Sequence, residues 1–403
     1  MQDAVASAIR TNEDVTIAEL TLKRAEAVIR EAKSARWFNV EATGRYQRAT
    51  SHATDESPTT GYIAGASVNL VQPLFTFGTI SNAVKAASIA GEMAQYQHQD
   101  YIRELTHSAK VSYYQALLAS EQLRLAELSL SNALNSKRLI ENSSSVRIAQ
   151  SDYVKISSDI AMRMVEVEKA RLERDRAHRL LSIICGYEED IVLSDKLTFN
   201  TAQASELSAS ALQVALKANP TLNMLAKESE LHEASAKAAF GGHLPTLSLL
   251  AGWEGSSASD KFAKTSGDEL HNSETGYVGV QLSVPLLDGG RARAQAAQKR
   301  ADALIAKTTY NKSLRYMKQD LVDAVERYNR YLMIYQSEEN AIKLADRSYN
   351  MSLSRFRTGQ TSATELNDAE QGLSSLRLAH SFTIFSIYEA LSNIEKLVGG
   401  TSI

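Results

Sequence analysis

Two carboxylates lie close together in the second half of the sequence, within the stretch TGQTSATELND. Glu365 and Asp368 are three residues apart, so a helix would present both on one face. Gly359 suits a left-handed turn after a preceding helix, and Thr361 or Ser362 can cap the next one. Two interpretations are open for the acids: a charged site that favours cations, or first-turn acids that the helix dipole favours and water surrounds.

The first half contains a corresponding polar break, VRIAQSD, over residues 146–152. At an offset of 213 residues, Asp152 corresponds to Glu365. Val146 stands where the other break has glycine, and Lys155 stands where it has its second acid. The acidic charge at the two breaks is therefore uneven, and the sequence does not define the turn in the first half.

Residues for catalysis or cofactor binding form no recognisable set. The 8 histidines show no metal-ligand spacing, and there is no phosphate-binding loop, nucleophile elbow or pair of catalytic carboxylates. The single cysteine, Cys185, ends an apolar helical stretch, where a small buried hydrophobe is the ordinary interpretation. The sequence therefore predicts a protein that is not an enzyme and has no catalytic residue, metal or cofactor.

Composition narrows the class of protein further. Only 19 glycines and 5 prolines interrupt 403 residues, which favours a few very long elements over several small domains. A net charge of -3 argues against nucleic acid as a partner. No run of 18 apolar residues occurs, so a helix that spans a membrane is not expected. The N-terminal stretch has no signal-peptide pattern, so either the protein is cytosolic or a signal is absent from the given chain.

The chain repeats itself with a period of about half its length. Pro73 corresponds to Pro285, and Cys185-Gly186 corresponds to Val398-Gly399. Two heptad-like stripes agree in register at an offset of 212 residues, with Glu338 as the one charged exception. The stripes are Ala109, Ser112, Ala116, Ala119, Leu123, Ala126, Leu130 and Ala133, and Leu321, Ala324, Tyr328, Tyr331, Tyr335, Glu338, Ile342 and Ala345.

The pattern therefore predicts two structural repeats, 1–186 and 208–403, which are joined by a linker over 187–207 and together form one intertwined domain. Each repeat is expected to begin with a helix, near 3–35 and 208–240. Strands are expected near 37–49, 61–74, 245–257 and 275–287, and long helices near 79–142, 149–184, 289–355 and 361–398.

The four predicted strands alternate between apolar and polar residues. Val40 and Tyr46 oppose Glu41 and Arg45 in the first strand, for example. Such alternation is typical of a membrane barrel wall, and also of an ordinary half-buried antiparallel sheet. Four strands cannot close a barrel, because about eight is the smallest number seen. Strands that cross a membrane would therefore require several chains.

The ordered set of motifs in this duplicated frame resembles the TolC-like outer-membrane channel family over essentially the whole chain. The set includes two strand ends that lead through Pro-Leu and glycine into an alanine-rich helix, LVQPLFTFGTISNAVKAA and LSVPLLDGGRARAQAA. It also includes ANPTL over 218–222, LPTLSL over 244–249 and RFRTG over 355–359. The resemblance implies a mainly α-helical homotrimer with a membrane β-barrel part. Four strands per chain would contribute to a 12-stranded barrel, and the long coiled-coil helices would form an α-barrel as a periplasmic tunnel.

The resemblance also assigns roles to particular residues. The strand-to-helix switch points would be Pro73, Gly78, Pro285 and Gly289, since proline cannot donate to a strand ladder and glycine eases the bend. The breaks between paired helices would form the periplasmic tip. Copies of Glu365, Asp368 and Asp152 around one axis would form its acidic aperture. The tip turn and the adaptor docking site would comprise Phe356, Arg357, Gly359, Val146 and Arg147.

The function implied is a passive exit duct in the outer membrane of a Gram-negative bacterium. Its partners would be outer-membrane lipid, a periplasmic adaptor protein, and an inner-membrane ABC or proton-driven transporter that supplies the energy. Type I protein secretion is slightly favoured over small-molecule efflux. The alternative is a soluble coiled-coil scaffold or periplasmic adaptor, in which the strands are merely hairpins.

Overall fold

A computed structural model describes residues 1–51, 59–142, 150–187, 193–200, 205–259 and 273–399. The chain divides into two compact units, each made of segments from both halves of the sequence. Unit 1 comprises Met1–Glu19, Tyr96–Asn223 and Lys312–Ile403, and unit 2 comprises Leu20–Gln95 and Met224–Asn311. Within the described residues, no helix combines the length and the apolar character needed to cross a membrane.

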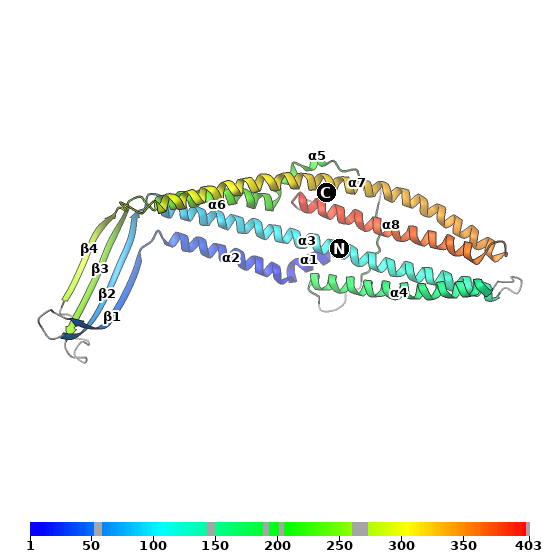
Figure 1. Ribbon diagram of the computed structural model, residues 1–403, viewed down its shortest axis with the longest axis horizontal. Coiled ribbons are helices and arrows are strands. Elements are labelled where there is room, and N and C mark those ends of the chain that lie inside the picture. Colours follow the sequence, from blue (N-terminus) through cyan, green and yellow to red (C-terminus); the bar gives the residue numbers. More distant parts are fainter. Residues whose placement is uncertain (52–58, 143–149, 188–192, 201–204, 260–272, 400–403) are drawn as a thin grey trace. The chain divides into compact units, whose positions relative to one another are not determined.

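Unit 2 contains an antiparallel sheet with the strand order β1-β2-β3-β4, and Figure 1 shows these strands side by side. The strands are β1 (Asn39–Ser51), β2 (Thr59–Phe75), β3 (Thr246–Ser259) and β4 (Ser273–Ser283). The first repeat supplies β1 and β2, and the second supplies β3 and β4, so the β2–β3 pairing joins the two halves of the sequence.

The register of the sheet gives it two chemically different faces. Because side chains alternate along a strand, residues paired across strands share a face. Val40, Leu70, Ala251 and Val278 are successive partners on one face. The neighbouring position of each strand points to the opposite face. There the successive partners are Glu41, Asn69, Gly252 and Tyr277. The predicted separation of apolar and polar residues thus extends across all four strands.

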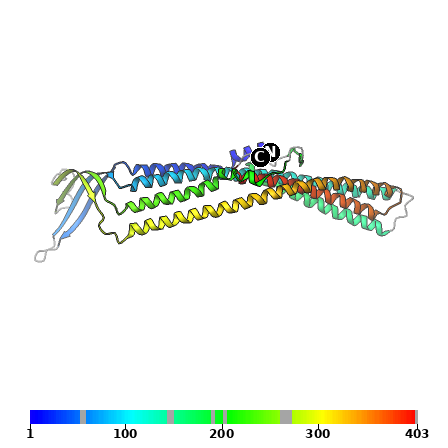
Figure 2. The same cartoon turned by 90° about the horizontal axis from the view of Figure 1, so that it is seen from above.

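Two very long helices run from unit 2 into unit 1: α3 (Thr79–Asn142) and α7 (Arg291–Arg357). In unit 1, α4 (Gln150–Cys185) lies beside α3, and α8 (Ala363–Leu397) lies beside α7, as both Figure 1 and Figure 2 show. The α3/α4 pair and the α7/α8 pair turn back at the same end of this unit, which we call the tip.

The predicted heptad-like stripes form the contacts of the long helices. Ala109 and Ala116 of α3 and Leu321 and Ala324 of α7 are all buried. The charged exception, Glu338, has a partner: its carboxylate lies 3.5 Å from Nδ1 of His380 on α8. The Glu338 side chain keeps 16% of its surface exposed, so the acid in this otherwise apolar stripe is only partly buried.

The helices predicted near 3–35 and 208–240 are not continuous. The first is broken at Asn12, between α1 (Gln2–Thr11) and α2 (Glu13–Ser34). The second is broken at Asn219, which separates α5 (Ala209–Leu212) and the 3₁₀ turn η2 (Ala215–Ala218) from α6 (Pro220–Gly241). Both asparagines are extended, and their side chains accept hydrogen bonds from nearby backbone N–H groups. An Asn side chain that bonds locally, and at 219 a following proline, compete with the helix.

Each break meets the C-terminal end of a long helix. Thr11 Oγ1 donates to the carbonyl of Cys185 at 2.8 Å, where α4 ends. Asn219 Nδ2 donates to the carbonyl of Leu397 at 2.9 Å, where α8 ends. The two halves therefore build the same kind of junction, in which a side chain next to one helix satisfies a terminal carbonyl of another.

The described part of the predicted linker crosses helices from both halves. Tyr113 of α3 donates to Asp195, and Tyr388 of α8 donates to the carbonyl of Thr198 at 2.8 Å. Phe199 packs edge-on against Tyr335 of α7 and against Tyr388. Residues 193–200 thereby fasten α3, α7 and α8 together near the middle of the two long helices.

Candidate functional site

The start of α8 holds the two acids that the sequence singles out. Ser362 caps the helix: its hydroxyl accepts from the backbone N–H of Glu365 at 3.2 Å. The hydroxyl of Thr361 donates to the carboxylate of the same glutamate. Glu365 and Asp368 are both exposed. Their arrangement satisfies the helix-cap interpretation and still leaves both carboxylates open to solvent at the tip.

The turn before this cap follows the predicted pattern. α7 ends at Arg357, and Gly359 adopts a φ of 72°, a left-handed conformation that suits glycine. Its N–H donates to the carbonyl of Phe356 at 3.0 Å, and the N–H of Gln360 donates to the carbonyl of Arg355 at 2.8 Å. These bonds satisfy carbonyls that the helix end would otherwise leave unpaired.

The predicted docking residues differ in accessibility. Arg357 is exposed, whereas Phe356 is buried in an apolar cluster with Ile156, Ile160 and Leu366. Val146 and Arg147 lie outside the described residues, and Asp152 belongs to the first turn of α4. Of this set, Arg357 and Gly359 offer surface at the tip, and Phe356 contributes to its core.

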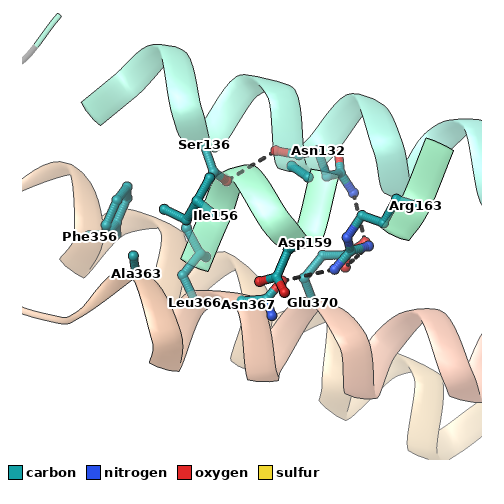
Figure 3. A pocket seen from close by; sticks show the side chains of 11 residues that line it. Asn132, Ser136, Ile156, Asp159, Arg163, Phe356, Ala363, Leu366, Asn367 and Glu370 are labelled. Carbon is teal, nitrogen blue, oxygen red and sulfur yellow. Dashed lines mark hydrogen bonds and ion pairs between the residues drawn. The ribbon is translucent and has the colours of Figure 1, made fainter. Parts of the chain in front are cut away.

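A buried polar network lies just inside the tip, and Figure 3 shows it beside a small cavity. Arg163 of α4 and Glu370 of α8 form an ion pair at 2.6 Å, with side chains only 11% and 8% exposed. Arg163 also donates to Asn367 at 2.9 Å and to Ser129. Asn132 and Ser129 of α3 both donate to the Glu370 carboxylate. The network therefore joins three helices.

The sequence contained a signal for this network. Ile156, Ile160 and Val167 are buried positions of α4, and Arg163 occupies the same stripe. On α8, Glu370 stands between buried leucines at 366 and 373. A single charge in each of two apolar stripes, with opposite signs, is what a buried inter-helix ion pair requires.

The strand-to-helix switches are built differently in the two halves. β2 continues through Pro73, which faces Ser248, to Phe75, with a register irregularity between the two. The expectation that Pro73 ends the ladder is therefore wrong. A bulge accommodates the missing N–H donor inside the strand. The bend itself comes at Phe77 and Gly78, whose φ angles are 45° and 86°.

In the second half, β4 ends at Ser283, and Pro285 lies beyond it. Gly289 and Gly290 have φ angles of 65° and 81°. Asp288 accepts from the N–H of Gly290 at 2.8 Å and of Ala292 at 3.0 Å, and these bonds lower the pKa of its carboxyl group. An aspartate cap thus starts α7, a role that the sequence analysis did not assign.

Two further apolar stripes are exposed in unit 1. They are Val154, Val165, Leu172 and Ile183 on α4, and Met333, Leu344 and Met351 on α7. The residues of each stripe are 7 or 11 positions apart, which is close to two or three full turns at about 3.6 residues per turn, so they lie on one face of the helix. α4 is thus apolar on two faces, one packed in the chain and one open, and such an open face is typical of an interaction surface.

Among the described residues, no group of three His, Cys, Asp or Glu side chains is placed to hold a metal ion.

Comparison with known proteins gives a consistent picture. The family model described as outer membrane efflux protein matches residues 4–146 and 211–400. The antibiotic efflux pump outer membrane protein ArpC of Pseudomonas putida is 23% identical over 420 residues, covering 99% of this chain and 83% of ArpC. The alkaline protease secretion protein AprF of Pseudomonas aeruginosa is 28% identical over 308 residues, which cover 73% of this chain and 58% of AprF. The outer-membrane channel OprN superimposes with a TM-score of 0.85 at 19% identity, covering 99% of this chain and 89% of OprN.

Proposed function

Because this chain belongs to the outer membrane efflux protein family, we propose that it is a homotrimeric channel that forms the passive exit duct of an export system. The observation that carries this proposal is the register of the four-stranded sheet. One face carries mainly apolar side chains, including exposed Val40, Val278 and Val280, and the other carries most of the polar ones, with Val71 and Leu250 as apolar exceptions. An apolar face toward lipid and a polar face toward water are what a barrel wall requires.

Three chains would supply the strands that one chain lacks. Among the residues that the structure describes, β1 and β4 have strand partners on one side only, so their outer edges are open there. Unpaired edge strands invite pairing with another copy, and closure removes the edges. A 12-stranded barrel in the outer membrane, with the helices as its periplasmic continuation, satisfies this requirement.

The exposed stripes of unit 1 support the same assembly. Val165 and Leu172 of α4 and Leu344 and Met351 of α7 are all more than half exposed in the single chain. Packing the α4 stripe of one chain against the α7 stripe of the next is a head-to-tail contact, which closes into a ring when the rotation permits. It would also bury apolar side chains that water otherwise surrounds.

Export through this duct would depend on partners. We assign energy supply to an inner-membrane ABC or proton-driven transporter and docking to a periplasmic adaptor at the tip. Arg357, Gly359, Val146 and Arg147 would contribute to docking, and Phe356 would support it from the core. Type I protein secretion is the branch we favour, since AprF, a secretion protein, matches at 28% identity. ArpC, whose name describes antibiotic efflux, supports small-molecule efflux as the alternative branch.

The acids at the tip would set ionic preference. Copies of Glu365, Asp368 and Asp152 around the trimer axis would form a ring that favours cations. Glu365 serves at the same time as part of the helix cap, and the two roles are compatible because its carboxylate remains exposed.

The decisive experiment is the molar mass of the purified protein by light scattering, with and without detergent. A species of three chains that requires detergent is expected. A well-behaved monomer or dimer in plain buffer would contradict the channel and favour the soluble coiled-coil scaffold or adaptor. Co-purification with an ABC-associated adaptor or with a proton-pump adaptor then separates the two export branches.

A further inference from the structure

A polar cavity of about 240 Å³ lies in unit 1, between α3 and the C-terminal end of α8. Its volume exceeds the roughly 30 Å³ that one water takes up in the liquid, so it can hold a small polyatomic ion. Its polar lining includes Arg103, His107 and Lys110 of α3, and Ser392, Glu395 and Lys396 of α8. Residues from both halves of the sequence therefore meet in one cavity.

The lining carries an excess of positive charge. Arg103, Lys110 and Lys396 are cations, whereas Glu395 is the only acid among the described residues that line the cavity. Glu395 pairs with Lys110. A lysine ammonium has three N–H donors, so Lys110 can still donate to another oxygen atom.

Two acids outside the lining offset this charge only in part. Asp100 pairs with Arg103, and Glu104 pairs with Lys396 at 2.6 Å. The side chains of these acids are 33% and 53% exposed, whereas those of Arg103 and Lys396 are 10% and 27% exposed. Because water screens an exposed charge more than a buried one, the two cations act more strongly than the two acids on a group inside the cavity.

The C-terminal end of α8 brings some negative charge to the same place, as the carbonyl end of any helix does. Two groups reduce this effect. Lys396 stands in the last turn of α8, and Asn219 Nδ2 donates to the Leu397 carbonyl at 2.9 Å. The helix end therefore does not cancel the positive charge of the lining.

Arg103 has hydrogen-bonding capacity that its contacts do not use. Its Nη2 donates to Thr221 Oγ1 at 3.0 Å and to Asp100. Its Nε and Nη1 are buried and have no hydrogen-bond partner among the residues that the structure describes. A guanidinium has five N–H donors, and a buried donor without a partner costs free energy. An oxyanion in the cavity could satisfy these donors after a small rotation of the side chain.

Comparison of the two repeats shows that the helix junction itself does not require these lysines. At the offsets that align the halves, Lys110 corresponds to Val322 of α7, and Lys396 corresponds to Ile183 of α4. Both halves nevertheless build the same kind of junction at the end of a long helix. The two lysines are therefore a feature of the α3–α8 cavity and not of the repeated fold.

We propose that this cavity is a binding site for one small oxyanion per chain, an ion with phosphate or carboxylate oxygens, held by Arg103, Lys110 and Lys396. The hydroxyl of Ser392 and the ring of His107, whose Nδ1 lies 2.9 Å from that hydroxyl, supply neutral polar contacts. The bound anion bridges α3 and α8, and it stabilises unit 1 by mass action. The site lies within one chain, so it goes beyond the proposed function and does not depend on it.

One variant replaces the site with the residues of the other half. Lys110→Val, Glu395→Ser and Lys396→Ile together give the residues found at the corresponding positions 322, 182 and 183. The change removes the Lys110–Glu395 pair as a whole, so neither charge is left without its partner. Lys343→Gln is the control, because it removes a lysine of α7 that is 63% exposed and lies outside the cavity.

Equilibrium dialysis of the detergent-solubilised protein against inorganic phosphate tests the site, with the ionic strength held constant by sodium chloride. Wild type is expected to saturate at one phosphate per chain. The triple variant should bind at least about 10-fold more weakly, since charge-assisted hydrogen bonds are lost, and the control should bind as wild type does. Equal binding by the triple variant and wild type would place the phosphate elsewhere and overturn the proposal.

A milder variant keeps the test decisive if the triple variant does not fold. Lys396→Gln removes one cation of the lining and leaves a polar side chain whose partner, Glu104, is about half exposed. Its affinity for phosphate should fall several-fold. An affinity equal to that of wild type would overturn the role of Lys396 and with it the proposed site.

Dialysis against succinate separates a carboxylate ligand from a phosphate ligand. Saturable binding of either ion that the variants weaken supports the site, and the ion that binds more tightly identifies the oxygen chemistry. Absence of saturable binding of both ions to wild type would overturn the proposal. Light scattering in detergent tests the trimer independently, so a failure of the anion site and a failure of the channel function are distinguished.

Discussion

The hydroxyl of Tyr277 on β4 lies 3.0 Å from Oδ1 of Asn69 on β2, and the side chain reaches it by crossing Gly252 on the intervening strand β3. A Cβ at position 252 would lie 2.6 Å from the Tyr277 ring and 2.8 Å from the Asn69 oxygen. The absence of a side chain at Gly252 is what permits the bridge. Because the bridge spans three strands and includes the β2–β3 pairing, it ties the strands of one half to those of the other.

Replacing this glycine should destabilise the sheet. Gly252→Ala forces Tyr277 off its position and breaks the bond to Asn69, with an expected loss of about 1–3 kcal/mol. The thermal midpoint of the detergent-solubilised protein measures it. Gly279→Ala is the matched control, because a Cβ at position 279 of β4 meets nothing within 4 Å. Equal midpoints for the two variants would contradict the importance of the bridge.

The tip turn should require glycine at position 359, as the sheet does at position 252. Gly359 has a φ of 72°, so Gly359→Ala should cost about 1 kcal/mol in unfolding free energy. Gly372 lies within α8, where a Cβ meets nothing within 4 Å, so Gly372→Ala should be stabilising by about 0.5–1 kcal/mol. Thermal midpoints that move in opposite directions are expected, and a shift of the same sign in both would argue against the left-handed turn.

Much of the fold was predictable because a long packed helix must place an apolar residue on the same face at every turn, and this repetition makes the pattern easy to recognise. The stripe through Ala109 and Ala116 and its counterpart through Leu321 and Ala324 predict the two longest helices, and α3 spans the predicted range 79–142. The motifs over 70–87 and 282–297 suggested the TolC-like family, and the family match confirms that assignment. The division into two repeats with a linker over 187–207 stays a prediction.

Local interruptions and exceptions were harder to predict. Asn12 and Asn219 break helices that the hydrophobic pattern predicts as continuous, because a single side chain competes with the backbone at one residue. In the sequence of either helix alone, Arg163 and Glu370 resemble surface charges. Their pairing depends on how α4 and α8 pack against each other, which the pattern of a single helix does not show. The open face of α4 was missed for a related reason: a helix that is apolar on two faces has little amphipathic signal.

The stability of unit 1 should depend on pH through His107. Burial, followed by the charge of Lys396, lowers the pKa of this histidine below its ordinary value of 6.5, and Lys110 acts in the same direction against Glu104. The folded state thus binds the proton less tightly than the unfolded state. The contribution is fully present above about pH 6.5 and is lost as the pH falls through the lowered pKa.

His107→Gln should therefore reduce the drop in thermal midpoint between about pH 7.5 and about pH 5.5. Glutamine keeps a polar group near Ser392 and Glu104 but does not titrate, so the change isolates protonation from packing. Thermal scans of both proteins at the two pH values give the difference directly. An undiminished drop in the variant would assign the acid sensitivity to other groups.

The exposed acids at the tip should control ionic preference in the assembled channel. Glu365→Gln with Asp368→Asn removes two negative charges per chain, and the loss of an acidic ring should lower the permeability ratio of cations to anions. The cap survives, because the Ser362 hydroxyl still accepts the backbone N–H of residue 365. Reversal potentials in asymmetric salt across a planar bilayer measure the ratio.

Glu326→Gln on α7, whose side chain is 62% exposed, removes one charge far along the chain from the tip and should leave the ratio unchanged. Unchanged selectivity in the tip variant would show that these carboxylates do not line the conducting path, and the helix-cap interpretation alone would then account for them.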